Sequence, residues 1–422
     1  GKINLVIRTV FGFIAPRGTT PQTKKIKKRG NTMLAIQGGK VITISGGVLE
    51  PGTVLVENGT IKAVGPAGEV AIPSGAELID ATGKWVTPGF IDAHTHISTF
   101  NEPQTMPGTY DGNEMSDPVT AHVRGIDALN PRDMAIGVVR AAGITTCYTG
   151  PGSANIVGGT GICFKTKEGK TVFDIAIPGT ECMKFALGEN PRRVYGSDKK
   201  MPMTRMGVGA LFRETLYRAK HYSDKLREGE ADSSKAPTPD FRLEALVPVI
   251  RREMKARIHC HRSDDIVTAV RVAEEFGLDY TIEHCTEGYL IADFLKEHNV
   301  KFVLGPLTVG PSKMELWNCT LKSPAIMEQS GITDFCIMED TSSQTKYLPT
   351  HIGLCMARGL SEEMAFRSVT VNPAKLLGIW DRVGSLESGK DADIAIWSGN
   401  PFSNFTLCET TIIDGDVYHN EN

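Results

Sequence analysis

The sequence predicts an α/β protein in which a barrel of alternating strands and helices is joined to a small β-sandwich. The chain has 422 residues, which exceeds one small domain but suits a large barrel with a second, smaller module. Short β-rich runs occupy both ends of the chain, and strand-like runs alternate with helical patterns between them. We therefore expect one (β/α)8 barrel, with the two halves of a sandwich before and after it.

The first 32 residues are expected to lie outside the fold. They contain an apolar start interrupted by Arg8 and a basic run, KKIKKRG, at residues 24–30. Such a charge run is typical of a solvated, loosely attached extension. Met33 opens the first regular pattern, so the fold is predicted to begin there.

Residues 33–87 and 379–422 are predicted to form the two halves of the sandwich. In the first half, β-rich runs are separated by glycine and asparagine turns, and Asn58-Gly59 is a strong hairpin signal. The second half returns to the same texture in KDADIAIWSGNP and TTIIDGDVYHNEN. Two β segments at opposite ends of the chain, around one barrel, would together form one small domain.

Residues 88–378 are predicted to form the barrel. Strand-like runs are followed by helical patterns, as in RIHCHRSDDIVTAVRVAEEFG and DYTIEHCTEGYLIADFLKEHN. This alternation implies a parallel sheet flanked by helices, and about 250 residues is typical of such a barrel. A long helical insert is expected between the strands at 182–187 and 256–260.

The composition excludes several classes of function. The formal net charge is −3, so no global field attracts nucleic acid or an anionic membrane. The sequence has no run of about 18 apolar residues, so no membrane span is predicted. The nine cysteines form no CxxC pair, and those in apolar runs are expected to be reduced core thiols of a cytoplasmic protein.

The segment GFIDAHTHIS, residues 89–98, places His94 and His96 two positions apart in a strand-like run. Residues i and i+2 share a face of a strand, so both imidazoles point the same way, with Asp92 beside them. At the carboxyl end of a barrel strand, where active sites lie, two imidazoles can share a divalent metal. Two hydrogen-bonded core histidines are the simpler alternative.

Further ligand-type residues end other predicted strands. His259 and His261 repeat the i, i+2 spacing, and His284 ends the strand in DYTIEHCTE, with Glu283 facing the other way. Asp340 ends the last barrel-like run, DFCIMED. Imidazole nitrogens and a carboxylate oxygen suit zinc and similar ions, and the ends of separate strands converge in a barrel. The sequence therefore predicts a metal site at these strand ends.

These motifs resemble those of the amidohydrolase superfamily, in particular its imidazolonepropionase-related, prolidase-like branch. The resemblance rests on PGFIDAHTHI, RIHCHRSDDI, TIEHCTEG, CIMED, TVNPAKLLG and GSLESGKDADIAIWSGNP, which occur in the family's order within residues 34–420. It implies a distorted (β/α)8 barrel with a β-sandwich made from both chain ends. The implied cofactor is one or two divalent metals per chain, most often zinc.

By this resemblance, His94 and His96 would bind the more buried metal, and His259 and His284 the more exposed one. Asp340 would bind a metal and handle the proton of the attacking water. One departure follows Asp340: the chain continues as EDTSSQTKYLP, where a more His- or Pro-containing segment is expected. This departure leaves the substrate contacts there open.

Strand four offers Lys184 as a bridging ligand, because binuclear members use a carboxylated lysine or a glutamate there. Lys184 lies in the largely apolar run CMKFALGEN. Burial would favour its neutral amine, which can take up carbon dioxide to form a carbamate with two oxygens. Glu181, Glu189 and a mononuclear site without a bridge are the alternatives.

Two further residues are candidates for binding substrate. His261 shares a strand face with His259, and Arg192 follows strand four in GENPRR. An arginine can hold a substrate carboxylate in bidentate fashion, although an exposed surface position is an equal alternative for Arg192.

We expect a metal-dependent hydrolase of an amide C–N bond in a small molecule such as a dipeptide, an N-acyl amino acid or a cyclic amide. A deaminase acting on a ring amidine would use the same metal chemistry, and an inactive scaffold is a third reading of the fold. Neither nucleic acid nor a membrane is expected as a partner, and the possibility of a homo-oligomer stays open.

Overall fold

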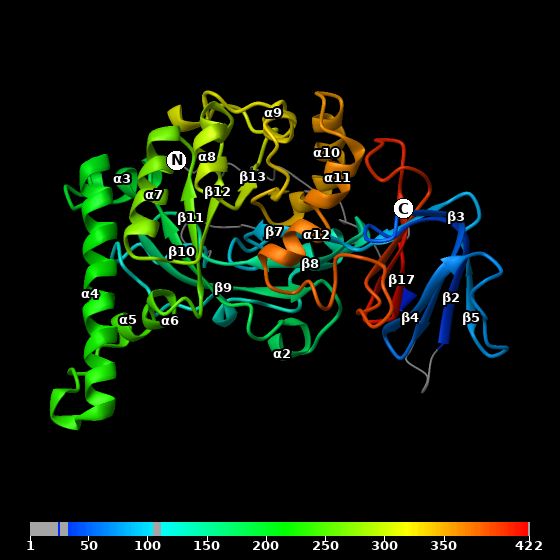
Figure 1. The fold of residues 1–422 in the computed structure, drawn as a ribbon, viewed down its shortest axis with the longest axis horizontal. Helices are drawn as coiled ribbons and strands as arrows, with labels where there is room; N and C mark the ends of the chain where they lie inside the picture. Colours follow the sequence, from blue (N-terminus) through cyan, green and yellow to red (C-terminus); the bar gives the residue numbers. More distant parts are fainter. Residues whose placement is uncertain (1–23, 26–32, 104–110, 421–422) are drawn as a thin grey trace, which may run out of the picture.

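The computed structural model describes residues 24–25, 33–103 and 111–420, which contribute strands to two sheets. Figure 1 shows a larger unit with helices around its strands, beside a smaller unit of strands from both ends of the described chain. The predicted fold class, a barrel with a separate β domain, is confirmed.

The sheet of the smaller unit has nine strands in the order β1-β17-β16-β15-β6-β2-β3-β4, with β5 paired to β2. Their bounds are β1 (Lys24–Lys25), β2 (Met33–Ile42), β3 (Val48–Glu57), β4 (Thr60–Pro66), β5 (Glu77–Asp80), β6 (Trp85–Pro88), β15 (Ile394–Trp397), β16 (Cys408–Ile413) and β17 (Asp416–His419). Both ends of the chain share one apolar core, to which Leu34, Val56, Ile394 and Ile412 belong.

The hairpin predicted at Asn58-Gly59 joins β3 to β4. These two residues have φ values of 53° and 83°, the left-handed backbone that a tight two-residue hairpin needs. A Cβ on Gly59 would lie 2.5 Å from the carbonyl oxygen of Asp414. The turn therefore needs glycine both for its backbone and for its close approach to the C-terminal half of the sheet.

One short strand comes from the segment predicted to lie outside the fold. β1 pairs antiparallel with β17, so that Lys24 lies opposite His419 and Lys25 opposite Tyr418. Pairing at a sheet edge uses backbone groups and does not require apolar side chains, which is why the charge pattern did not predict it. The rest of residues 1–32 lies outside the described residues.

The barrel sheet has eight strands in the order β14-β13-β12-β11-β10-β9-β8-β7. Their bounds are β7 (Phe90–Thr95), β8 (Ile144–Thr149), β9 (Val157–Lys165), β10 (Cys182–Ala186), β11 (Lys255–Cys260), β12 (Tyr280–His284), β13 (Phe302–Leu304) and β14 (Phe335–Ile337). Backbone hydrogen bonds from Asp340 N to His94 O (3.2 Å) and from His96 N to Thr341 O (3.1 Å) join its two ends. The sheet thus nearly closes into a barrel where the histidines lie.

β9 departs from the expected parallel sheet. It runs antiparallel to both β8 and β10, whereas the other paired neighbours are parallel. A glycine-rich loop, residues 150–156, joins β8 to β9 in place of a crossover helix, because antiparallel neighbours need only a short connection. This loop therefore lies at the carboxyl end of β8, close to the histidines.

The α-helices are α1 (Met134–Ala141), α2 (Val172–Ile175), α3 (Glu189–Gly196), α4 (Arg205–Ala231), α5 (Phe241–Glu244), α6 (Val247–Ile250), α7 (Ser263–Glu275), α8 (Ala292–Glu297), α9 (Ser323–Gln329), α10 (Leu348–Met356), α11 (Glu362–Ser368) and α12 (Val371–Leu376). Short 3-10 turns are η1 (Gly125–Asp127), η2 (Ser233–Lys235), η3 (Gly288–Ile291), η4 (Met314–Leu316) and η5 (Ser343–Tyr347). α3 to α6 form the predicted helical insert between β10 and β11.

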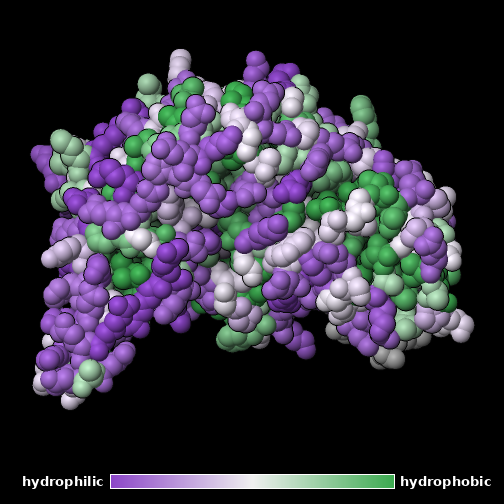
Figure 2. Space-filling view, viewed as in Figure 1, coloured by the Kyte–Doolittle hydropathy of each residue, from purple (hydrophilic) through white to green (hydrophobic). Residues whose placement is uncertain are grey.

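The long helix α4 runs along one side of the barrel and projects beyond it (Figure 1). Hydrophilic side chains cover most of its projecting end (Figure 2). Among the described residues, no helix combines the length and apolar character needed to cross a membrane.

Lys165, on β9, forms ion pairs between the barrel and the smaller unit. Its side chain is 2% exposed, and its Nζ lies 2.6 Å from Asp391 and 3.0 Å from Asp393. It also contacts Asp414, which Lys167 reaches at 2.7 Å. Burial alone would lower the pKa of Lys165, but the aspartates raise it above its ordinary value. The ammonium group therefore stays charged and is shared by three carboxylates.

Lys165→Met is expected to destabilise the protein by about 3–5 kcal/mol, because it leaves the buried Asp393 and the partly buried Asp391 and Asp414 without their shared cation. Thermal or denaturant unfolding measures the change. Lys62→Met is the matched control, since Lys62 is 60% exposed and pairs with Glu57 at 3.1 Å. An exposed pair contributes at most about 1 kcal/mol, so equal losses in the two variants would contradict the assignment.

Candidate active site

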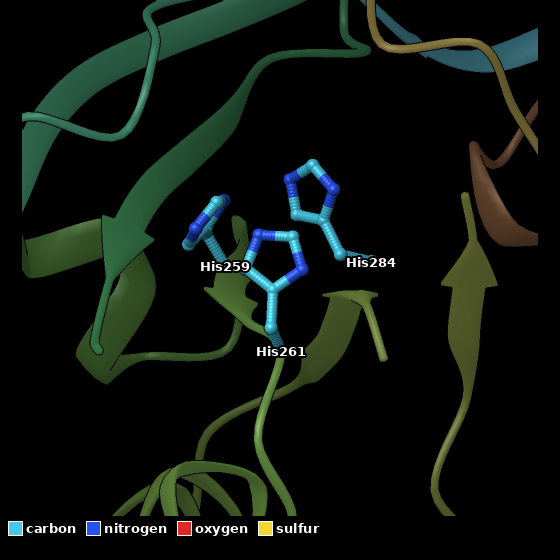
Figure 3. Close-up of side chains that lie close together, drawn as sticks. All are labelled: His259, His261 and His284. Atoms are coloured by element: carbon cyan, nitrogen blue, oxygen red, sulfur yellow. The ribbon is translucent and has the colours of Figure 1, made fainter. Parts of the chain in front are cut away.

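Five histidines gather at the carboxyl ends of the barrel strands. His94 lies on β7 with His96 just after it, His259 lies on β11 with His261 just after it, and His284 ends β12. All five are buried, none being more than 5% exposed. The rings of His259, His261 and His284 lie together (Figure 3), with centroids between 4.2 and 4.7 Å apart.

Asp340 joins this cluster from the last strand. It follows β14, and its Oδ1 lies 3.2 Å from His96 Nε2, 3.3 Å from His94 Nε2 and 3.9 Å from His284 Nε2. Two sets of ligand-type atoms result, and within each set all atoms lie within 4.8 Å of one another. The sets are His259, His261 and His284, and His94, His284 and Asp340.

The structure brings Lys184 to the cluster, and neither Glu181 nor Glu189. Lys184 is buried in the middle of β10, and its Nζ lies 3.2 Å from His94 Nε2. Glu181 comes just before β10, at the opposite end of the strand from the histidines, and Glu189 begins α3. Burial lowers the pKa of Lys184 to about 8, which makes its neutral amine accessible near neutral pH.

Protein acceptors hold one nitrogen of several rings. The Nδ1 atoms of His96 and His284 each lie 2.8 Å from a carbonyl oxygen, Gly150 O and Gly305 O respectively, and His261 Nδ1 lies 2.8 Å from the hydroxyl of Thr286. Such bonds fix the ring and leave Nε2 as the free electron-pair donor. His259 Nδ1 is buried and has no hydrogen-bond partner among the described residues.

Glu283 enters the site, contrary to the expectation that it faces away from His284. Its Oε2 lies 2.6 Å from His94 Nδ1. His284 has a φ of 71°, and this left-handed backbone interrupts the strict alternation on which the prediction rested. Asp92, predicted to stand beside the imidazoles, instead accepts the backbone N–H groups of His94 (3.0 Å) and Glu339 (3.2 Å).

Burial keeps most of the clustered imidazoles neutral. It lowers the pKa values of His96, His259 and His261, and it lowers the pKa of His284 to about 3. Burial alone would raise the pKa of Asp340, but His284 and the other nearby histidines hold it well below its ordinary value. A neutral imidazole and an ionised carboxylate are the forms that bind metal ions.

The metal-free protein is expected to lose stability as the pH falls below about 6.5, the ordinary pKa of histidine. In this range the unfolded chain binds protons that the folded protein, with its lowered histidine pKa values, does not bind. Each such histidine removes up to about 1.4 kcal/mol of unfolding free energy per pH unit. Urea unfolding of chelator-treated protein from about pH 7.5 to about pH 5.5 measures the slope, and a flat profile would contradict this expectation.

The two predicted substrate-binding residues differ in their placement. His261 packs against His259 and His284 and so belongs to the histidine cluster itself. Arg192, on α3, is half-buried, and its Nε donates to the carbonyl oxygen of Met203 at 3.5 Å. The α3 residue that reaches a clustered ring is Asn190, whose Nδ2 lies 3.5 Å from His259 Nε2.

A polar group beside His259 and His261 has no recognisable motif in the sequence. Lys313 Nζ lies 3.2 Å from Asn190 Oδ1 and 2.6 Å from Glu315 Oε1. Glu315 is buried, and its Oε1 lies 3.7 Å from His261 Nε2. These residues belong to loops and short turns that reach the site only through tertiary packing, so no local pattern marks them.

The residues present fit one or two divalent metals of the zinc type. Imidazole nitrogens and a carboxylate oxygen are zinc ligands, and held rings with one free nitrogen are typical of metal-binding histidines. The unpartnered Nδ1 of His259 is a buried polar atom that a bound ion would satisfy.

Known proteins resemble this chain in sequence and fold. Two models described as the amidohydrolase family match residues 77–141 and 328–418. The crystal structure of an amidohydrolase from Thermotoga maritima MSB8 is similar at 38% identity with a TM-score of 0.87, and the match covers 92% of this chain and 100% of that one.

Two further proteins are similar to this chain in sequence. Amidohydrolase tasK of Hapsidospora irregularis is 30% identical over 83% of this chain, which spans 38% of the length of tasK. Imidazolonepropionase of Maricaulis maris (strain MCS10) is 26% identical over 83% of this chain and 88% of that protein. The similarity to the Thermotoga maritima amidohydrolase, over the whole of that protein, shows that this chain belongs to the amidohydrolase family.

Proposed function

We propose that this protein is a metal-dependent hydrolase that cleaves an amide C–N bond in a small molecule such as a dipeptide, an N-acyl amino acid or a cyclic amide. The observation that carries the proposal is the convergence of five buried histidines, Asp340 and Lys184 at the carboxyl end of the barrel. In barrel enzymes this end of the strands bears the active site.

His94 and His96 would hold the more buried metal, and His259 and His284 the more exposed one. Lys184 would join the two sites as a carbamate, formed when its neutral Nζ attacks carbon dioxide and loses a proton. The 3.2 Å distance from Nζ to His94 Nε2 supports this role. When bound, divalent metals would lower the pKa of a water molecule to about 7 and polarise the scissile carbonyl.

Asp340 would move the proton in this reaction. Its carboxylate would accept a proton from the attacking water, and the same proton would then pass to the nitrogen of the leaving amine. The lowered pKa of Asp340 supports an ionised carboxylate at the start of the reaction. The products are a carboxylic acid and an amine.

His261 has two roles that the geometry supports. It could touch the substrate, or it could complete a three-imidazole metal site with His259 and His284, since their ligand atoms lie within 4.8 Å of one another. His261→Ala separates the two, because only the second role makes the metal content fall.

Purified protein is expected to contain a divalent transition metal, because at least four ligand-type side chains converge at the strand ends. Elemental analysis per chain, followed by a screen of dipeptides and N-acyl amino acids, tests the proposal. Well under one equivalent of metal, with no activation by added zinc, manganese or cobalt, would overturn it. Release of ammonia from a ring amidine, without amide cleavage, would instead show a deaminase.

A further inference from the structure

A buried carboxylate, both of whose oxygens accept hydrogen bonds, lies next to His94 of the histidine cluster. Glu283 and Arg257 both have fully buried side chains. Arg257 donates from Nη2 to Glu283 Oε2 at 2.6 Å and from Nε to Oε1 at 3.1 Å. Thr281 Oγ1 donates to Oε1 at 2.6 Å, and His94 Nδ1 lies 2.6 Å from Oε2. One carboxylate therefore meets four donors from three residues.

Arg257 also holds the backbone next to His94. Its Nη2 donates to the carbonyl oxygen of Ala93 at 2.6 Å. Its guanidinium group lies over the ring of Tyr148, 3.9 Å from the ring centroid. Arg257 thus fixes His94 in two ways, through Glu283 at the ring and through Ala93 at the main chain.

This arrangement decides which nitrogen of His94 carries the proton. A carboxylate paired with arginine accepts hydrogen bonds and donates none, so the contact with Glu283 requires a proton on His94 Nδ1. In the neutral ring the lone pair then lies on Nε2, which is 3.2 Å from Lys184 Nζ and 3.3 Å from Asp340 Oδ1. The free nitrogen of His94 therefore faces the proposed metal site.

His94 differs in this respect from its neighbours. His96, His284 and His261 each place Nδ1 against a neutral oxygen, either a backbone carbonyl or the hydroxyl of Thr286. An ionised acceptor forms a stronger hydrogen bond than a neutral one and makes the imidazole a better electron-pair donor. Of the clustered rings, His94 is therefore the one set up as the strongest metal ligand.

We infer that Arg257 and Glu283 are positioning residues, which fix the Nδ1–H form of His94 and thereby strengthen metal binding at the buried side of the cluster. The effect on metal binding rests on the proposed function, whereas the effect on the His94 proton does not. Neither residue needs to touch substrate for this role.

The test replaces both members of the pair, Arg257→Met with Glu283→Met, because removing one alone leaves an uncompensated buried charge. Proton–nitrogen NMR of metal-free protein with labelled histidine, assigned with His94→Asn, reports the position of the His94 proton. We expect the Nδ1–H form alone in the unmodified protein and a mixture of both forms in the double variant. Competition with a chromophoric chelator should show a zinc Kd higher by roughly 10- to 100-fold, the usual scale for such partners.

Arg213→Met with Glu275→Met is the matched control. This pair has the same residue types and a similar two-bond geometry, with contacts of 2.9 and 2.5 Å. It joins α4 to α7 at the surface, where the Arg213 side chain is 50% exposed and the Glu275 side chain 37% exposed. It should leave both the His94 proton and the zinc Kd unchanged.

A double variant that keeps the Nδ1–H form and binds zinc within about twofold of the unmodified protein would overturn the inference. If that variant does not fold, Glu283→Asp takes its place, since it keeps the charge beside Arg257 but withdraws the carboxylate from His94 by one methylene. It should change both readouts in the same direction, and no change would again overturn the inference. If the unmodified protein binds no zinc, the proposed function fails, while the NMR result still decides the role of the pair.

Discussion

Asp340→Asn should lower kcat by roughly 10²-fold or more while keeping the fold and most of the bound metal. A carboxylate can take a proton from the attacking water, and a neutral amide of the same shape cannot, so the loss should be that of a general base. The position supports this role, because Oδ1 lies within 3.3 Å of the Nε2 atoms of His94 and His96. Steady-state kinetics with the substrate found in the screen, together with metal analysis, measure both effects.

Glu339→Gln is the internal control for this experiment. Glu339 precedes Asp340 in the chain, but its carboxylate contacts His351 of α10. The Glu339→Gln variant should therefore keep kcat within a few-fold of that of the unmodified enzyme. Normal turnover by Asp340→Asn with an inactive Glu339→Gln would remove the proton-transfer role from Asp340 and give it to its neighbour.

Lys184→Ala should lose nearly all activity and one metal equivalent. Alanine has no amine to form a carbamate, so the proposed bridging ligand between the His94 side of the cluster and the His259 side would be lost. Because Lys184 is fully enclosed in the barrel, small carboxylates such as acetate should occupy the space that the side chain leaves and restore part of the activity. Metal content and activity, measured with and without added acetate, test both parts.

Lys255→Ala serves as the control for Lys184. Lys255 begins the neighbouring strand β11 at the opposite end of the barrel, where its Nζ pairs with Asp279 at 2.9 Å. The Lys255→Ala variant should keep full metal content and activity. A fully active Lys184→Ala enzyme with two metals would disprove the carbamate bridge.

Much of the site could be predicted from the sequence because its residues follow local rules. The i, i+2 spacing puts His94 with His96 and His259 with His261 on common strand faces. The position of Asp340 after the last strand of the barrel could likewise be predicted, since parallel strands bring their carboxyl ends together. The structure places all five of these residues in one cluster, although their roles toward a metal remain proposals.

Other predictions were wrong where a local rule was interrupted. The left-handed backbone of His284, φ 71°, brings its ring to the side of the strand that Glu283 already faces with Thr281, and no residue pattern predicts such a backbone at a histidine. The antiparallel direction of β9 could not be predicted from its residues, because strand direction depends on the connection and not on side-chain alternation.

The sequence by itself determined the fold class, the β-rich ends that share one core, and the types of residue that stand at the strand ends. These properties follow from hydrophobic periodicity and turn chemistry, which act over a few neighbouring residues. Only the tertiary structure decided that Lys184 and not Glu181 reaches the histidines, and that Glu283 with Arg257 holds His94. Those partners are separated by many residues along the chain, so their contacts depend on how the whole barrel closes and not on any local pattern.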